Sequence, residues 1–193
     1  MTNDYFVYYL LHKPKGYITT TSDEFNRPTV LDLIKVPERV FPVGRLDENT
    51  SGLIILTNDG QFSNMLTHPS HEISKTYQLT IRGFLPKPVI KRLESGIMLQ
   101  DTKTAPAIVK LLGRDGKSET FKLTIHEGKN RIIRRMCGVL KLELLDLKRV
   151  AIGFLRDENL GVGKYRKLTE KEIKDLSVLV GLTGLIDKLI MDL

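Results

Sequence analysis

The sequence predicts an α+β protein whose mainly antiparallel mixed sheet is flanked by helices. Short apolar segments with the alternation of strands recur along the 193 residues, and one pair of them flanks an Asp-Gly turn typical of a β-hairpin. Helical patterns with clear start and stop signals lie between these segments. Because no internal repeat or low-complexity linker occurs, we expect one domain over residues 1–193, with residues 177–193 as an extension without an assigned role.

Several expected elements are bounded by a proline, a glycine or a capping residue. We expect strands at residues 5–11, 53–57, 76–82, 107–112, 121–125 and 142–152. We expect helices at residues 30–34, 61–67, 86–96, 130–140 and 169–180. Asp59 is placed to cap the second of these helices, and Thr169 with Glu172 has the spacing of a capping box at the start of the last. In the strand at 76–82, alternation places Tyr77, Leu79 and Ile81 on one face.

Charge and cysteine content restrict the class of protein. The net charge of +7 favours a polyanionic partner such as nucleic acid, although simple solubility explains it as well. A single cysteine, Cys137, excludes an internal disulfide framework and a multi-cysteine zinc site, and we expect a buried helix thiol in a reducing cytoplasm. There is no run of about 20 apolar residues and no basic leader before an apolar segment, so we expect neither secretion nor a membrane span.

A glycine-bounded loop at residues 44–52 carries Arg45 and Asp47 directly before an apolar strand. A carboxylate that a neighbouring cation keeps ionised and oriented has the properties of a nucleophile or a general base. A turn aspartate that hydrogen-bonds its own backbone explains the same residue. Glu48 adjoins Asp47, but neighbouring side chains on an extended chain point in opposite directions, so the two make a poor acid–base pair for a hydrolase.

Basic residues concentrate in the segment at 129–136. On a helix, Arg131, Arg134 and Arg135 share one face, and three guanidinium groups there attract phosphates or a catalytic carboxylate. A solvated basic face is the alternative. Tyr77 could stack on a base or pack in the core.

Three short motifs offer weaker signals. The loop with Lys13 and Lys15 could hold phosphate or form an ordinary turn. His68 and His71 lack further ligands at metal spacing, so we expect no metal. Residues 161–164 lack the remaining features of a phosphate-binding loop and are expected to form a turn.

The order of these motifs closely resembles that of the RsuA/RluB/RluE branch of ribosomal RNA pseudouridine synthases. The resemblance runs from about Tyr8 to Leu176. It rests on Lys13-Pro14-x-Gly16, on Gly44-Arg45-Leu46-Asp47 with Ser51-Gly52-Leu53 and Thr57-Asn58-Asp59-Gly60, on Lys75-Thr76-Tyr77, and on Glu127-Gly128-Lys129-Asn130-Arg131 with Arg134-Arg135-Met136.

The resemblance implies the pseudouridine synthase fold and a cofactor-independent isomerase that detaches uracil from its ribose, turns it and rejoins it through ring carbon five. It assigns Asp47 as the catalytic carboxylate, Tyr77 to the active-site wall, Arg134 to the pair with Asp47, and Arg45 to the flipped nucleotide. Because uridine in structured RNA is stacked, such an enzyme must extrude it and bind the surrounding backbone with cations. We expect RNA contacts from Lys13, Lys15, Lys75, Lys129, Asn130, Arg131 and Arg135.

Two departures accompany the resemblance. Many relatives have glutamine where this chain has Ile132, which affects RNA contacts more than bond chemistry. Many also begin with a small RNA-binding domain, for which residues 1–4 leave no room. We expect a cytoplasmic monomer acting on ribosomal RNA, with large-subunit RNA preferred; a non-catalytic RNA-binding or ribosome-assembly protein on the same fold is the alternative.

Overall fold

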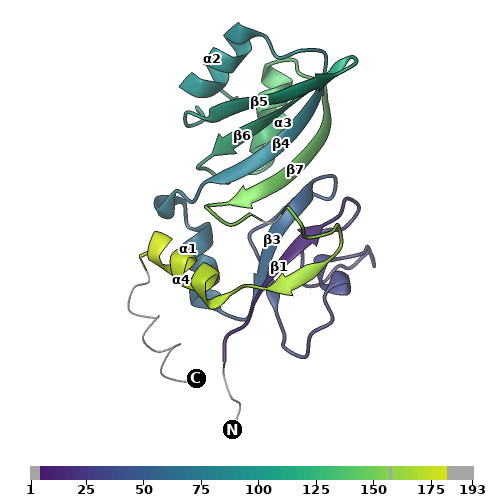
Figure 1. Cartoon of the computed structure of the whole chain (residues 1–193), viewed down its shortest axis with the longest axis vertical. Coiled ribbons are helices and arrows are strands. Elements are labelled where there is room, and N and C mark those ends of the chain that lie inside the picture. Colours follow the sequence, from purple (N-terminus) through teal and green to yellow (C-terminus); the bar gives the residue numbers. More distant parts are fainter. Residues whose placement is uncertain (1–4, 157, 182–193) are drawn as a thin grey trace. The chain divides into compact units, whose positions relative to one another are not determined.

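The computed structural model describes residues 5–156 and 158–181 (Figure 1). Their contacts form two compact units: unit 1 contains residues 5–73 and 158–181, and unit 2 contains Ser74–Arg156. The expectation of a single catalytic domain stays a prediction. The extension expected at 177–193 lies within the described residues only up to residue 181.

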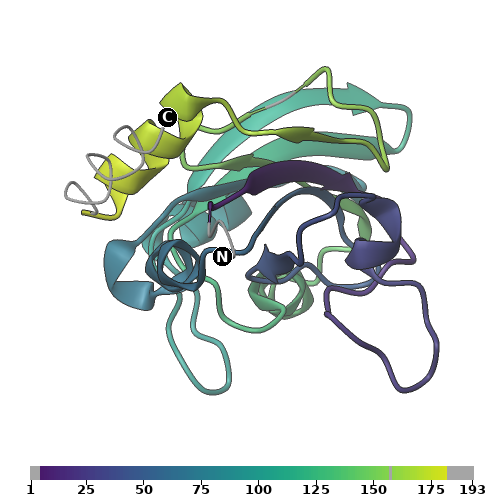
Figure 2. The same ribbon diagram turned by 90° about the horizontal axis from the view of Figure 1, so that it is seen from below.

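Unit 1 is built on an antiparallel sheet. β1 (Tyr8–Lys13) pairs with β3 (Ser51–Thr57) on one side and with β8 (Tyr165–Lys167) on the other, and β2 (Phe41–Val43) pairs with β3 (Figures 1 and 2). All six residues of β1 are buried. The register sets Lys13 opposite Gly52, so the end of β1 lies beside the start of β3.

The helices of unit 1 begin at the capping residues predicted from the sequence. α1 (Gly60–Thr67) is capped by Asp59, whose carboxylate accepts a hydrogen bond of 2.9 Å from the Phe62 amide. α4 (Glu170–Leu179) begins with the predicted capping box of Thr169 and Glu172. Two short 3₁₀ helices also lie among the described residues of unit 1. They are η1 (Val30–Leu33), where a helical turn was expected, and η2 (Pro69–His71).

Unit 2 contains an antiparallel sheet in the order β5, β6, β4, β7. The bounds of these strands are β4 (Lys75–Arg82), β5 (Ile108–Asp115), β6 (Ser118–Ile125) and β7 (Leu144–Ile152). β5 and β6 form the predicted hairpin, but its turn lies one residue later than expected, because Asp115 pairs with Ser118 and Gly116 begins the two-residue loop. Gly116 has φ of 55°, which glycine adopts without steric cost.

One hydrophobic core joins the sheet of unit 2 to α2 (Lys87–Ser95) and α3 (Ile132–Val139), and α3 lies behind the sheet in Figure 1. Leu79 and Ile81 are buried in this core and Tyr77 packs against it, so the predicted face of β4 is confirmed. Members of the core on the other elements include Leu93, Phe121, Leu123, Ile133, Met136, Cys137 and Leu147. In the described part of the chain, no helix combines the length and apolar character needed to cross a membrane.

Candidate active site

Asp47 lies in a tight turn between β2 and β3. Gly44 opens the loop with φ of 71°, and the carbonyl of Asp47 accepts a hydrogen bond of 3.0 Å from the Thr50 amide. Leu46 and Thr50 are buried on either side, whereas Asp47 is only partly exposed and Arg45 is exposed. The buried residues Leu46 and Thr50 therefore anchor the loop, and the exposed Arg45 side chain stays accessible to a ligand.

A buried lysine supports this loop through hydrogen bonds to its backbone. Lys13 has no exposed surface, and its ammonium donates hydrogen bonds to the carbonyls of Thr50 (2.8 Å), Pro14 (2.9 Å) and Glu48 (3.3 Å). The Gly16 amide donates a further bond of 2.9 Å to Glu48. The expectation that Lys13 contacts RNA is wrong, because its ammonium is enclosed by backbone carbonyls and cannot reach a phosphate at the surface. Lys15, two residues later, is exposed.

Thr19 provides a second anchor for the same loop. Its hydroxyl donates a hydrogen bond of 2.8 Å to the Leu46 carbonyl, and the Leu46 amide donates one of 3.2 Å back to the Thr19 oxygen. Backbone groups are thus fixed immediately before Asp47, at Asp47 and after it. Such fixation orients a catalytic carboxylate without loss of conformational entropy at the moment of reaction.

Unit 2 brings together a second set of polar side chains on the core face of its sheet. Tyr77 of β4 pairs with Arg149 of β7 beside an irregularity in the ladder between Thr76 and Tyr77. Arg149 is only 4% exposed, and the pKa of Lys75 is lowered by burial and by the Arg149 charge. A buried arginine and a partly buried lysine thus lie beside Tyr77 in the strand ladder.

The motifs of the sequence do not include Arg149. The signal that points to it is its phase: it lies two residues after Leu147, a member of the core, so alternation places it on the core face of β7, where it pairs with Tyr77.

The basic segment differs from its expected geometry at one residue. Arg131 has a left-handed conformation with φ of 48° and precedes α3 as its cap, so the prediction that three arginines share one helical face is wrong for Arg131. Arg134 and Arg135 lie in the first turn of α3 and are partly exposed. Cys137 is a buried helix thiol, as predicted; burial raises its pKa to about 11, against the opposing effect of Arg134.

Ion pairs engage two of the expected RNA-binding cations. Lys129 pairs with Glu127 at 2.9 Å and donates a hydrogen bond of 2.9 Å to the Thr102 hydroxyl, and Arg135 pairs with Asp101. The Arg135 hydrogen bond and the Lys129 charge lower the pKa of Asp101. Asn130 is exposed. Both Lys129 and Arg135 therefore already have acidic partners. Across the described ranges, no three His, Cys, Asp or Glu side chains group closely enough to hold a metal ion.

The chain matches one family of known proteins in both sequence and structure. The family model described as RNA pseudouridylate synthase matches residues 7–138, which include the Asp47 loop, Tyr77 and the basic segment. A crystal structure of a pseudouridylate synthase superposes with a TM-score of 0.82 at 32% identity, covering 91% of this chain and 76% of that one. The fold class predicted from the sequence is confirmed, and the class is that of an isomerase acting on RNA.

The chain belongs to the RNA pseudouridylate synthase family. It is 48% identical over 176 residues to ribosomal large subunit pseudouridine synthase B of Bacillus subtilis, covering 90% of this chain and 72% of the relative. It is 38% identical to the protein of the same name from Pseudomonas aeruginosa, of which it covers 46%.

Proposed function

We propose that this chain isomerises a uridine of large-subunit ribosomal RNA to pseudouridine, with Asp47 as the catalytic carboxylate. In this reaction the bond between base nitrogen one and the ribose breaks, and a bond from ring carbon five to the same ribose carbon forms. Carbon five loses a proton and nitrogen one gains one, so atoms and electrons balance without a redox partner. Two similar proteins are named for the large ribosomal subunit, which supports this choice of RNA.

The observation that carries the proposal is the fixed backbone around Asp47. The hydrogen bonds from Lys13 to the carbonyls of Glu48 and Thr50 and the paired hydrogen bonds of Thr19 hold the loop, while Arg45 on the same loop stays exposed. A turn aspartate without chemical function needs no buried ammonium beneath its loop, since such an ammonium loses hydration that costs several kcal/mol. The arrangement is what a positioned nucleophile or base requires.

The remaining roles rest on the resemblance and stay predictions. Tyr77 is proposed to stack beneath uracil and to take the proton from ring carbon five, and Arg134 to keep Asp47 ionised. Arg45 would hold the flipped nucleotide. Further RNA contacts are proposed for Lys15, Lys75, Lys129, Asn130, Arg131 and Arg135.

The test is tritium release from ribosomal RNA labelled at uridine ring carbon five. Asp47→Ala and Asp47→Asn should reduce release by at least about 10³-fold, because neither alanine nor asparagine can act as a nucleophile or a base. RNA affinity, measured by filter binding, should be unchanged. Tyr77→Phe and Arg134→Gln should also lose release in the same assay. Retained release by Asp47→Asn, or lost binding with retained chemistry, would contradict the proposal.

The same experiment distinguishes the proposed isomerase from the alternative, a non-catalytic RNA-binding protein. That alternative expects Asp47→Asn to leave every measured property intact. We further propose that the chain acts as a monomer in the cytoplasm. A stable dimer of the free chain in light scattering would contradict the monomer. Recovery of the chain outside the cytoplasmic fraction of cells would contradict the cytoplasmic location.

A further inference from the structure

An exposed aromatic side chain stands out on a loop of unit 1. Phe25 is 76% exposed, more than any other large apolar side chain among the described residues. Its loop runs from the end of β1 to η1 and is closed at its base, where the Ile18 amide donates to the Pro28 carbonyl at 2.9 Å and the Val30 amide to the Ile18 carbonyl at 3.0 Å. The ring is therefore displayed by a closed loop.

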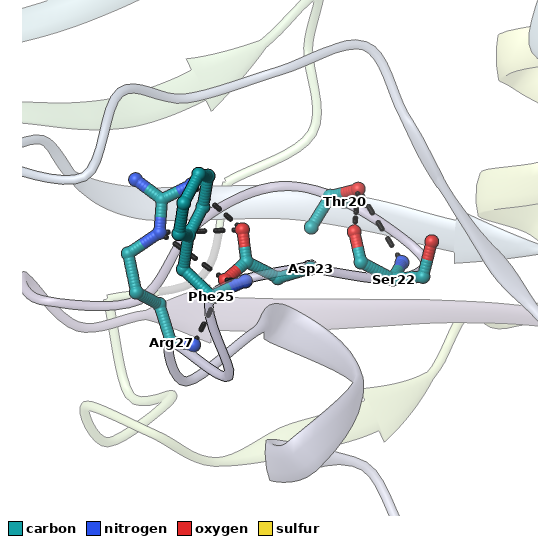
Figure 3. Close-up of polar contacts among 5 residues, drawn as sticks. All are labelled: Thr20, Ser22, Asp23, Phe25 and Arg27. Atoms are coloured by element: carbon teal, nitrogen blue, oxygen red, sulfur yellow. Dashed lines mark hydrogen bonds and ion pairs between the residues drawn. The ribbon is translucent and has the colours of Figure 1, made fainter.

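Asp23 fixes the conformation of this loop from inside (Figure 3). Its carboxylate accepts hydrogen bonds from the amides of Phe25 (3.1 Å) and Arg27 (2.9 Å) and from the Arg27 guanidinium (2.6 Å). Its side chain is only 7% exposed, and Arg27 lowers its pKa to about 2. Asn26 completes the turn in the left-handed conformation, which asparagine tolerates. The carboxylate is thus ionised at neutral pH and holds Phe25 outward.

Arg27 supports one face of the ring. Its guanidinium carbon lies 5.4 Å from the centre of the Phe25 ring, within the range of a cation–π contact (Figure 3). Because Asp23 pairs with the same guanidinium, Arg27 contributes a flat surface more than a free charge. The other face of the ring is open to a flat ligand.

The loop is tied to the loop of Asp47. Thr19, which belongs to it, exchanges hydrogen bonds with Leu46, and Gly16 at its start donates to the Glu48 carbonyl. The pKa of Arg27 is raised by its hydrogen bond to Asp23 and also by the charge of Glu48. Phe25 is thereby held at a fixed position relative to the proposed catalytic carboxylate, within the same unit.

The surroundings of Phe25 favour a nucleobase over a protein partner. Docking sites for proteins are contiguous apolar patches, whereas Glu24, Asn26, Arg27 and Pro28 around Phe25 are exposed and three of them are polar or charged. A single aromatic face backed by a guanidinium is instead the usual platform for an unpaired base.

We propose that Phe25 stacks on an unpaired base of the RNA that flanks the target uridine, with Asp23 and Arg27 as the residues that position the ring. This inference rests on the proposed function, because it takes RNA as the substrate. Since stacking involves little charge, this contact should depend less on salt than contacts of lysine and arginine with phosphates.

The chain contains no tryptophan, so Phe25→Trp introduces a single fluorescent reporter at the platform. We expect a single-stranded RNA 12-mer to quench this tryptophan, and a fully paired duplex of the same sequence not to quench it. The measurement is repeated with Asp47→Ala added. Quenching in that background reports stacking independently of catalysis, so failure of this inference and failure of the proposed function give different results.

Phe84 is the matched control. It is 52% exposed on unit 2, Arg114 lies 4.4 Å above its ring, and Glu119 pairs with that arginine at 2.9 Å, so it repeats the Phe, Arg and carboxylate arrangement in the other unit. The Phe84→Trp reporter should be unaffected by RNA. Equal quenching at both positions, or no quenching at position 25, overturns the proposal.

Affinity for the single strand gives a second readout. Phe25→Ala should bind about 10-fold more weakly and Phe25→Tyr should bind like the wild type, as expected for loss and retention of one stacked base. Phe25→Leu, which keeps an apolar side chain without a ring face, should be as weak as Phe25→Ala. Wild-type affinity in Phe25→Leu overturns the proposal, since it would show a general apolar contact. Because Phe25 is exposed, none of these changes should shift the melting temperature.

Discussion

The loop of Asp47 in unit 1 and the basic segment at residues 129–136 in unit 2 are held by different kinds of interaction. Backbone carbonyls around the buried Lys13 fix the first. Ion pairs at the surface, Arg135 with Asp101 and Lys129 with Glu127, hold the second. Backbone bonds to a buried cation define one geometry, whereas exposed ion pairs exchange partners at little cost.

This difference matches the two tasks of an RNA-modifying enzyme. A catalytic carboxylate must be held within about 0.5 Å of its productive position. Cations that bind a polyanion must release one set of anions and accept another, and exposed ion pairs such as those of Lys129 and Arg135 allow this exchange.

The largest effect is expected at the buried cation. Lys13→Met keeps most of the apolar part of the side chain but leaves the carbonyls of Glu48 and Thr50 without their donor, and should lower the free energy of unfolding by about 3 kcal/mol. Tritium release should fall as well, because the Asp47 loop loses its support. Urea denaturation measures the first effect. Lys15→Met, at an exposed neighbour, is the control and should leave stability nearly unchanged.

A smaller effect, on binding, is expected in the basic segment. Asp101→Asn removes the carboxylate that occupies Arg135, so RNA affinity at low salt should rise by about 3-fold. Arg135→Gln should weaken binding and reduce the slope of log affinity against log salt by about 1. The control is Asp115→Asn, an identical charge change at an exposed hairpin residue. If both asparagine variants strengthen binding equally, the ion pair of Arg135 has no special role.

The smallest effect concerns an ion pair that serves the fold of unit 1. Arg166 binds Glu172 through two hydrogen bonds of 2.7 and 2.8 Å, and these bonds lower the pKa of the Glu172 carboxyl to about 2. Because the pKa of Glu172 is lower in the folded chain than its unfolded value of 4.5, the ion pair stabilises the fold at pH values above 4.5. This stabilisation is lost as the pH falls from 4.5 through about 2. Glu172→Gln should therefore lower the melting temperature at pH 7 by roughly 2–4 °C and have little effect near pH 2.

Calorimetry at both pH values measures this difference. An equal loss at pH 7 and pH 2 would show that Glu172 acts through packing and not through its charge. RNA affinity should be unaffected by Glu172→Gln, in contrast to Asp101→Asn, because the former pair belongs to the cap of α4.

Local signals predicted the fold well because they act over a few residues. Asp59 caps α1 and Thr169 with Glu172 opens α4, where the sequence placed them. Alternation likewise predicted the buried face of β4 at Leu79 and Ile81. The hairpin turn was displaced by one residue, because Asp115 and Gly116 satisfy two neighbouring turn positions and cross-strand pairing decides between them.

The errors at the site come from interactions between segments distant in sequence. Nothing in the residues around Lys13 distinguishes a surface lysine from one enclosed by the carbonyls of Glu48 and Thr50, 35 and 37 residues later. Arg131 matched a helical face by spacing, but the chain enters α3 through a left-handed residue that side-chain type does not reveal. Arg149 belongs to no motif, and only its alternation with Leu147 along β7 indicates that it is buried.

The role of Asp47 is tested most directly by mapping pseudouridines in ribosomal RNA of cells that lack this chain. One uridine of the large-subunit RNA should lose its modification and regain it with the wild-type chain but not with Asp47→Asn, expressed at the same level. Restoration by Asp47→Asn, or no pseudouridine lost from ribosomal RNA, would contradict the account.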